Sequence, residues 1–222
     1  MRERRMRILG AVSAGLMMTG SAAAQTAVQV ESGALRGSDA DGVEAFKGVP
    51  FAAPPIGALR WRAPQPANAW PGVRDATHYG HDCMQRPFPS DAAPLGTSPS
   101  EDCLVLNIWR PKGATGKLPV LFWIYGGGFV NGGASPQVYD GAALARLGMI
   151  VVSANYRLGR FGYFVHPALS TAKEGPVGNW GLMDQQAALR WVQRNIAAFG
   201  GDPTRVTIMG ESAGGASVFH LL

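Results

Sequence analysis

The sequence predicts an α/β fold with a mostly parallel sheet, on two observations. Three uninterrupted apolar runs, Leu118–Tyr125, Met149–Asn155 and Val206–Met209, have the length and composition of strands that are buried on both faces. An amphipathic helix pattern over Gly181–Phe199 lies between the last two runs. The order strand, helix, strand favours parallel strands with helices covering both sides of the sheet.

The N-terminal part of the chain predicts a β-hairpin followed by irregular structure. Ala27–Gly37 and Gly42–Phe51 alternate weakly between apolar and polar residues, and Asp39–Gly42 between them is rich in turn-forming residues. Residues 52–100 are dense in proline and short of periodic apolar runs. We expect Trp61 and Trp70 to anchor this irregular segment to the core.

The helix pattern over Gly181–Phe199 has one apolar face and a clear stop. Its apolar residues recur at steps of three, four and seven: Leu182, Leu189, Val192, Ile196 and Phe199. Gly200-Gly201 predicts the C-terminal stop, and Asp202-Pro203 predicts a turn into the next strand. Residues 213–222, directly after the last apolar run, have the composition of a further helix.

Residues 1–24 resemble a secretory signal peptide. Arg2, Arg4, Arg5 and Arg7 precede the apolar stretch Ile8–Thr19, and Ala22-Ala23-Ala24 offers a cleavage site before Gln25. The apolar stretch is shorter than the roughly 20 residues that a membrane span needs, which disfavours the alternative of an uncleaved anchor. We therefore expect an exported protein, periplasmic or secreted, with no stable membrane span.

Charge argues against nucleic acid as a partner. Removal of residues 1–24, which carry four Arg and one Glu, would lower the formal net charge from +5 to +2. That charge is too small for the electrostatic footprint of a nucleic-acid-binding surface.

Export also affects the interpretation of the two cysteines. Cys83 and Cys103 form an even pair in a protein predicted to enter an oxidising compartment, which favours a disulfide. The closest approach to a metal-ligand pattern is His78 with His81 and Cys83, in a turn-rich stretch. We expect no metal site and no cofactor.

A candidate catalytic motif follows the last apolar run. Gly210-Glu211-Ser212-Ala213-Gly214 has the form G-x-S-x-G and lies between a predicted strand and a predicted helix. A nucleophile elbow needs this sharp turn, because it lifts the serine hydroxyl clear of the sheet edge. The alternative is an ordinary glycine-rich turn.

A second glycine-rich segment follows the first predicted strand. Tyr125-Gly126-Gly127-Gly128-Phe129 lets the backbone run close to a bound acyl group and point its N–H groups at one oxygen atom. Such loops form the oxyanion hole of lipases and esterases. Together the two motifs predict acyl transfer through a serine ester, a reaction that needs no cofactor.

These motifs resemble those of the type-B carboxylesterases, the family that includes the cholinesterases. The resemblance extends from about Val28 to Leu222 and is carried by five further segments: Pro54–Gly57, Leu59–Trp61, Glu101–Asn107, Gly178–Gln185 and Phe199–Gly215. It implies the N-terminal part of the α/β-hydrolase fold and a small-molecule ester as substrate.

The resemblance also implies roles for individual residues of the site. Ser212 matches the nucleophile, and the N–H groups of Gly127, Gly128 and Ala213 match the oxyanion hole. Glu211 matches an acidic neighbour that shapes the site.

Further matches are structural. Cys83–Cys103 matches the family's first disulfide, whereas Arg60 with Glu101 and Arg157 with Asp184 match buried ion pairs that fix loops. Cholinesterases carry a choline-binding Trp inside the first disulfide loop, but residues 84–102 contain none. This difference argues for a general carboxylesterase.

A catalytic acid and histidine are missing from the expected positions. In this fold they follow the nucleophile, yet the ten residues after Ser212 contain no Asp or Glu and only His220. Eight residues of helix place His220 about 12 Å from Ser212, beyond hydrogen-bonding reach.

We therefore expect residues 25–222 to be an incomplete hydrolase domain, inactive alone, whose acid and histidine lie beyond residue 222. Two alternatives remain. One is a non-catalytic, cholinesterase-like interaction module, and the other is a serine amidase or thioesterase on the same scaffold.

Overall fold

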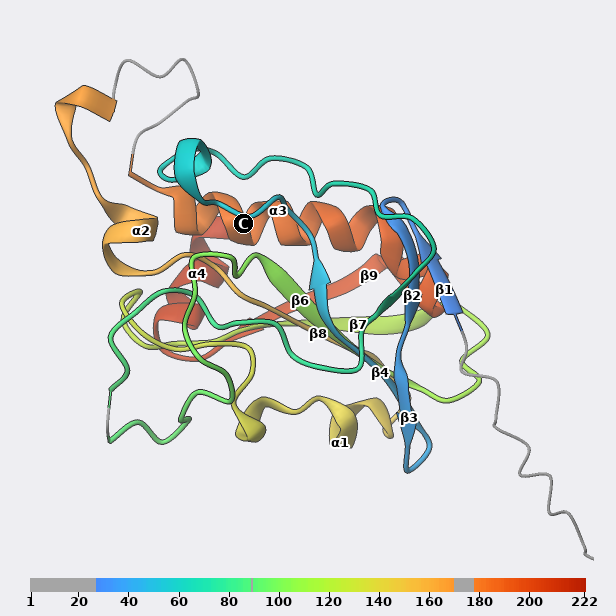
Figure 1. The fold of residues 1–222 in the computed structure, drawn as a ribbon. Helices are drawn as coiled ribbons and strands as arrows, with labels where there is room; N and C mark the ends of the chain where they lie inside the picture. The colour runs from blue at the N-terminus through green and yellow to red at the C-terminus, as the bar shows by residue number, and fades with distance from the viewer. Residues whose placement is uncertain (1–26, 89, 170–177) are drawn as a thin grey trace, which may run out of the picture.

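A computed structural model describes residues 27–88, 90–169 and 178–222 (Figure 1). The predicted signal peptide lies outside these residues. None of the helices in the described part of the chain combines the length and apolar character that crossing a bilayer requires.

The central feature is a six-stranded mixed sheet with the strand order β3-β4-β6-β8-β7-β9. Its strands are β3 (Ser38–Ala40), β4 (Val43–Pro50), β6 (Val105–Pro111), β7 (Leu118–Ile124), β8 (Ile150–Ala154) and β9 (Gly201–Gly210). The three predicted strands β7, β8 and β9 are confirmed, and β7 pairs in parallel with both β8 and β9. The pairs β3/β4, β4/β6 and β6/β8 are antiparallel.

The expectation of a mostly parallel sheet therefore holds only for the β8-β7-β9 half. Parallel strands need a crossover connection: α1 (Ala142–Ala145) lies in the one from β7 to β8, and α3 (Trp180–Asn195) lies in the one from β8 to β9, which both neighbour β7. In the described part of the chain β3, β4 and β6 follow one another with no α-helix between them, and they pair antiparallel.

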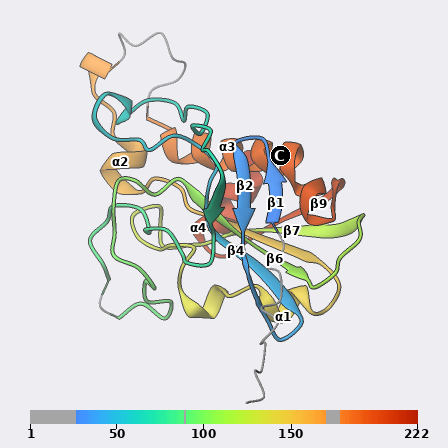
Figure 2. The ribbon, with the colours of Figure 1, turned by 45° about the vertical axis from the view of Figure 1, so that its right-hand side comes forward.

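The predicted N-terminal hairpin is in fact two hairpins. Ala27–Gly37 does not form one strand but folds on itself as β1 (Ala27–Val30) and β2 (Gly33–Arg36). With β5 (Val73–Asp75), these strands form a separate three-stranded sheet. Figures 1 and 2 show β1 and β2 beside the C-terminal end of α3, where Glu31 pairs with Arg194 at 2.8 Å.

The second hairpin joins β3 to β4 at the predicted turn. Asp41 and Gly42 both have left-handed backbone angles, with φ of 51° and 76°. Paired left-handed residues suit a two-residue hairpin turn because their twist matches that of the flanking strands.

Helices cover both faces of the sheet. On one face, α3 and the short helix Ile196–Phe199 bury Ala188, Trp191 and Val192 against the main core. On the other, α1 (Ala142–Ala145) covers a smaller cluster around Trp109 and Val151.

The buried face of α3 is displaced from the predicted one, because Leu182 and Leu189 are only half-buried. Gly200 ends the helical stretch as predicted, with φ of 84°.

The strands differ in burial from the prediction. All five residues of β8 are buried, but β9 is half-exposed, and Met209 is 49% exposed. The reason is position: β9 is an edge of the described sheet, with β7 as its one neighbour there. The predicted turn at Asp202-Pro203 lies inside β9, where Asp202 Oδ1 accepts a hydrogen bond from the Thr204 N–H at 2.9 Å.

Of the two predicted tryptophan anchors, Trp70 packs against the core as expected, whereas Trp61 does not belong to the core cluster. Trp61 donates its indole N–H to the Arg160 carbonyl at 2.8 Å and packs on Phe164. Trp70 donates to the Ala34 carbonyl at 2.9 Å and packs against the main core. Trp61 thereby ties the irregular segment to α2 (Gly159–Tyr163).

Candidate functional site

Ser212 lies in a strained turn between β9 and α4 (Ala213–Leu221), as the motif predicts. Its φ of 53° and ψ of −119° lie in a region that residues with a side chain rarely adopt. Such a conformation costs on the order of 1–3 kcal/mol and tends to occur at functional sites. Ser212 is exposed, while the residues on its C-terminal side turn into the buried start of α4.

The flanking glycines are required by packing. A Cβ atom on Gly214 would lie 2.1 Å from the Ile124 carbonyl oxygen of β7. A Cβ atom on Gly210 would lie 2.3 Å from the carbonyl carbon of Gly214. Any side chain at either position would therefore displace the turn from the sheet.

The glycine loop after β7 lies against this turn. A Cβ atom on Gly126 would lie 3.0 Å from the Cβ of Ser212, so the two backbones are in close approach. Gly127 and Gly128 have φ of 97° and 61°, and the Gly127 carbonyl accepts hydrogen bonds from the N–H groups of Val130 and Asn131. These bonds curl the loop back on itself.

The predicted oxyanion donors are unengaged. Within the described residues, the N–H groups of Gly127, Gly128 and Ala213 donate to no other backbone or side-chain group. Ala213 is the first residue of α4, where helix N–H groups have no partner in the helix. The arrangement leaves these donors available to an oxygen atom bound beside Ser212.

Glu211 lies beside the glycine loop, and Tyr139 lies near enough to Glu211 for that carboxylate to affect the pKa of Tyr139. A Cβ atom on Gly126 would clash with Glu211 Oε2, which puts this carboxylate beside the glycine loop. Burial raises the pKa of Tyr139, and the nearby carboxylates of Glu211 and Asp91 raise it further. The sequence motifs did not indicate Tyr139, because it belongs to a short helical turn far from Glu211 along the chain.

The predicted disulfide is present and fully buried. Cys83 and Cys103 are joined, and both have almost no exposed surface. The bond closes the loop 84–102 over the region of the glycine loop, where Gln85 hydrogen-bonds to Gly132 and Asp91 to Asn131.

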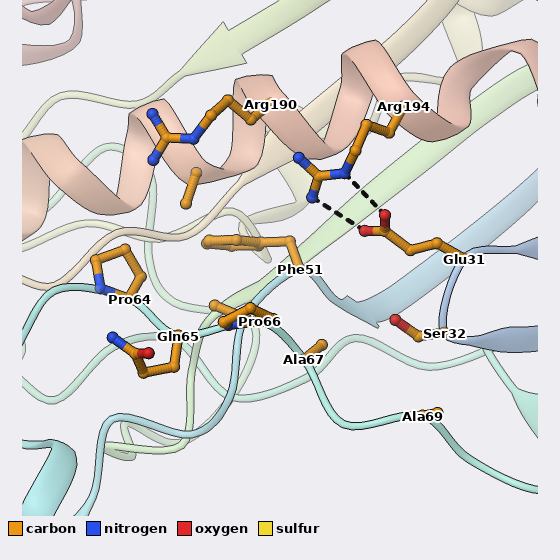
Figure 3. Close-up of a pocket in the computed structure, with 12 residues that line it drawn as sticks. Glu31, Ser32, Phe51, Pro64, Gln65, Pro66, Ala67, Ala69, Arg190 and Arg194 are labelled. Atoms are coloured by element: carbon orange, nitrogen blue, oxygen red, sulfur yellow. Dashed lines mark hydrogen bonds and ion pairs between the residues drawn. The ribbon is translucent and has the colours of Figure 1, made fainter.

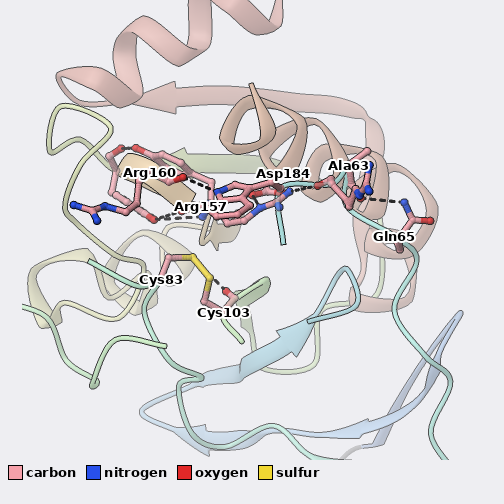
Figure 4. Close-up of polar contacts among 11 residues, drawn as sticks. Ala63, Gln65, Cys83, Cys103, Arg157, Arg160 and Asp184 are labelled. Carbon is pink, nitrogen blue, oxygen red and sulfur yellow. Dashed lines mark hydrogen bonds and ion pairs between the residues drawn. A yellow bond between two sulfur atoms is a disulfide. The ribbon is translucent and has the colours of Figure 1, made fainter. Parts of the chain in front are cut away.

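Both predicted ion pairs form, but only one is buried. Arg157 Nε and Nη2 each donate to the Asp184 carboxylate at 2.8 Å, with side chains 4% and 0% exposed. Figure 4 shows this pair near the disulfide. Arg60 and Glu101 form a bidentate pair, yet the Arg60 side chain is 39% exposed, so the expectation of burial is wrong for that pair.

None of the four histidines bonds to Ser212 in the described part of the chain. His220 is exposed on α4, and His78 bonds to its neighbour Thr77. His81 bonds to the Ser98 carbonyl, and His166 accepts from the N–H of Ala168. Within the described residues, Ser212 therefore has no histidine as a hydrogen-bonding partner.

Two grooves lie away from the elbow. One, of about 500 Å³, runs between α3 and residues 64–69 and is closed at one end by the Arg194–Glu31 pair (Figure 3). The other, of about 670 Å³, is lined by the start of the disulfide loop, by Val130 and by residues 158–161. Only the second adjoins the glycine loop, through Val130.

Comparison with known proteins finds similar sequences over most of the chain. A model of the carboxylesterase family matches residues 24–222. The chain is 51% identical to the fumonisin B1 esterase of Sphingopyxis macrogoltabida over 195 residues, which cover 86% of this chain and 36% of that protein. It is 52% identical to the cholinesterase of Mus musculus over 193 residues, which cover 81% of this chain and 31% of that protein.

A solved structure shows the same fold. A thermophilic PNB esterase superposes with a TM-score of 0.80 at 45% identity, over 87% of this chain and 40% of that one. The chain thus spans about a third of the length of these curated relatives and two fifths of that structure.

Proposed function

Because the chain belongs to the carboxylesterase family and has the N-terminal part of the α/β-hydrolase fold, we propose that it carries the nucleophile and oxyanion loop of a serine carboxylesterase. The observation that carries this proposal is the strained turn at Ser212, packed against Gly126 of the glycine loop. A strained serine at the head of a helix, beside free backbone N–H groups, suits covalent acyl transfer.

In the proposed reaction, the Ser212 Oγ attacks the ester carbonyl carbon and its proton passes to a general base. The carbonyl oxygen becomes an oxyanion that accepts hydrogen bonds from the N–H groups of Gly127, Gly128 and Ala213. Collapse of this intermediate expels the alcohol, which takes up the proton, and leaves an acyl group on Ser212. Water then releases the carboxylic acid by the same route.

The general base and its acid are proposed to come from sequence beyond residue 222. This proposal is supported by the four histidines, none of which bonds to Ser212 within the described residues, and by the greater length of the relatives. The test is hydrolysis of p-nitrophenyl acetate by the 222-residue chain and by a version extended to the natural stop codon. We expect activity only in the longer protein, abolished by Ser212→Ala. Equal, Ser212-dependent activity in both would overturn the proposal.

The same experiment separates the alternatives. An extended protein that hydrolyses no ester, although it folds, would favour a non-catalytic interaction module. Faster cleavage of amide or thioester analogues than of matched oxygen esters would favour an amidase or thioesterase on this scaffold.

We also propose that the protein is exported after removal of residues 1–24. The basic and apolar pattern of that segment supports export, as does the buried Cys83–Cys103 disulfide, because disulfides persist in oxidising compartments. Mass spectrometry of the periplasmic and secreted fractions should find a chain that begins at Gln25. Recovery of the chain only in the cytoplasm, with Met1–Ala24 still attached, would refute export.

A further inference from the structure

The groove beside the glycine loop has a composition that indicates its ligand. Five apolar side chains line it, together with the arginines Arg86 and Arg160: Met84, Pro87, Val130, Leu158 and Phe161. No Asp or Glu lines it. Its volume of about 670 Å³ is in the range of small-molecule sites.

The two arginines are free to bind an anion. Both side chains are exposed, and within the described residues neither forms an ion pair, unlike Arg60 and Arg157. Figure 4 shows Arg160 on the side of Arg157 away from Asp184. A guanidinium group offers planar paired donors that match a carboxylate.

The residues next to the two arginines hydrogen-bond to the glycine loop and to the segment that follows it. Gln85, next to Arg86, hydrogen-bonds to both the N–H and the carbonyl of Gly132, at 2.8 Å and 2.6 Å. Gly159, next to Arg160, donates its N–H to the Phe129 carbonyl at 2.7 Å. The groove is therefore fixed relative to the oxyanion loop on two sides.

The groove also borders the oxyanion loop directly. A Cβ atom on Gly128 would lie 3.9 Å from the Val130 Cγ2, so the side chain that lines the groove stands beside an oxyanion donor. An ester whose carbonyl oxygen lies at Gly128 can extend past Val130 into the groove. Its chain would contact apolar side chains, and its far end would meet the two guanidinium groups.

We propose that this groove is a subsite for esters that carry a carboxylate, such as half-esters of aliphatic dicarboxylic acids. The assignment of substrate class rests on the proposed esterase function, whereas binding of the anion itself does not. The apolar lining favours an organic carboxylate over a small inorganic anion, since phosphate would leave that lining without contacts.

The first test measures ligand binding to the 222-residue chain and does not require the chain to be enzymatically active. Glutarate and its neutral analogue glutaramide are titrated while NMR signals are followed, with inorganic phosphate as the comparison anion. We expect glutarate to bind more tightly than either, and Arg86→Gln and Arg160→Gln each to weaken it about tenfold, the scale of one charge-assisted hydrogen bond. Arg146→Gln, which removes an exposed charge after α1, is the matched control.

The second test uses the extended protein. The ratio of kcat/KM for the p-nitrophenyl half-ester of glutaric acid to that for p-nitrophenyl butyrate should fall about tenfold in each arginine variant and stay constant in Arg146→Gln. Equal binding of glutarate and glutaramide, tighter binding of phosphate, or an equal effect of Arg146→Gln would overturn the subsite. An extended protein without activity would refute the esterase function, while the glutarate titration would still decide the anion groove.

Discussion

Gln185 on α3 donates a hydrogen bond to the Ser217 hydroxyl on α4 at 3.0 Å, and Ser217 donates in turn to the Ala213 carbonyl at 3.1 Å. Both side chains are buried. The bonds tie the helix behind the sheet to the first turn of α4, the turn that presents the Ala213 N–H. The position of that proposed oxyanion donor therefore depends on a contact between residues 32 positions apart in sequence.

We expect Ser217→Ala to destabilise the protein. The change removes both hydrogen bonds and leaves the buried Gln185 amide without its acceptor, at a cost of about 1–3 kcal/mol in the free energy of unfolding. Urea denaturation measures this cost, with the exposed Ala216→Ser on the same helix as control. Equal stability of Ser217→Ala and the parent would show that the bond contributes nothing.

Ser212 and Ser217 differ in exposure, and this difference allows a test of Ser212 as the proposed nucleophile. Ser212 is exposed at the elbow, whereas Ser217 is 0% exposed. In the extended protein we expect Ser212→Ala to abolish labelling by a fluorophosphonate probe, and Ser217→Ala to retain it. Labelling that survives Ser212→Ala would place the nucleophile elsewhere.

Neighbouring glycines of α4 should respond oppositely to alanine. A Cβ atom on Gly214 would meet the Ile124 carbonyl at 2.1 Å, whereas one on Gly215 would have its nearest neighbour at 3.4 Å. Gly214→Ala should cost about 3 kcal/mol or more or prevent folding, since the clash is with backbone. Gly215→Ala should be neutral or stabilising by up to about 1 kcal/mol, because alanine favours a helix. Similar midpoints of thermal unfolding for both variants would contradict the packing at the elbow.

The disulfide should be detectable and stabilising. Peptide mapping without reduction should recover Cys83 and Cys103 in one linked fragment. Replacing both cysteines by serine should lower the free energy of unfolding by about 3 kcal/mol, because a loop of this length is then free in the unfolded chain. Free thiols in protein recovered from an oxidising compartment would refute the pairing.

The buried carboxyl of Asp82 predicts a dependence of stability on pH. Burial raises the pKa of Asp82, although hydrogen bonds from Ser135 and Thr97 oppose that shift. A folded-state pKa above the unfolded value means that the folded protein binds this proton more tightly. The contribution of Asp82 to stability therefore increases as pH falls from neutral through the folded-state pKa, and levels off below the lower pKa of the unfolded chain.

Asp82→Asn tests that dependence. The difference in free energy of unfolding between the parent and Asp82→Asn, followed by urea denaturation from pH 7 downward, should shift in favour of the parent. A difference that is constant with pH would show that Asp82 titrates alike in both states.

Much of the fold and of the site could be predicted without a structure because the signals are local. The apolar runs of β7, β8 and β9 and the helix stop at Gly200 depend on neighbouring residues. The turn at Ser212 is similarly local, since its glycines are needed within two positions of the serine. The predictions that failed concern the place of each strand in the sheet: β9 is half-exposed because it is an edge of the described sheet, and β4 and β6 pair antiparallel with strands distant in sequence.

The sequence by itself thus determined the candidate serine, the glycine loop, the cysteine pair and the family, each of which is carried by a short motif. Only the tertiary structure decided that Gly126 has no room for a side chain beside Ser212, that Tyr139 lies near Glu211, and that Arg86 and Arg160 share one groove. The physical reason is that spacing along the chain sets backbone turns, whereas the meeting of side chains from separate loops is set by how the sheet brings those loops to one edge.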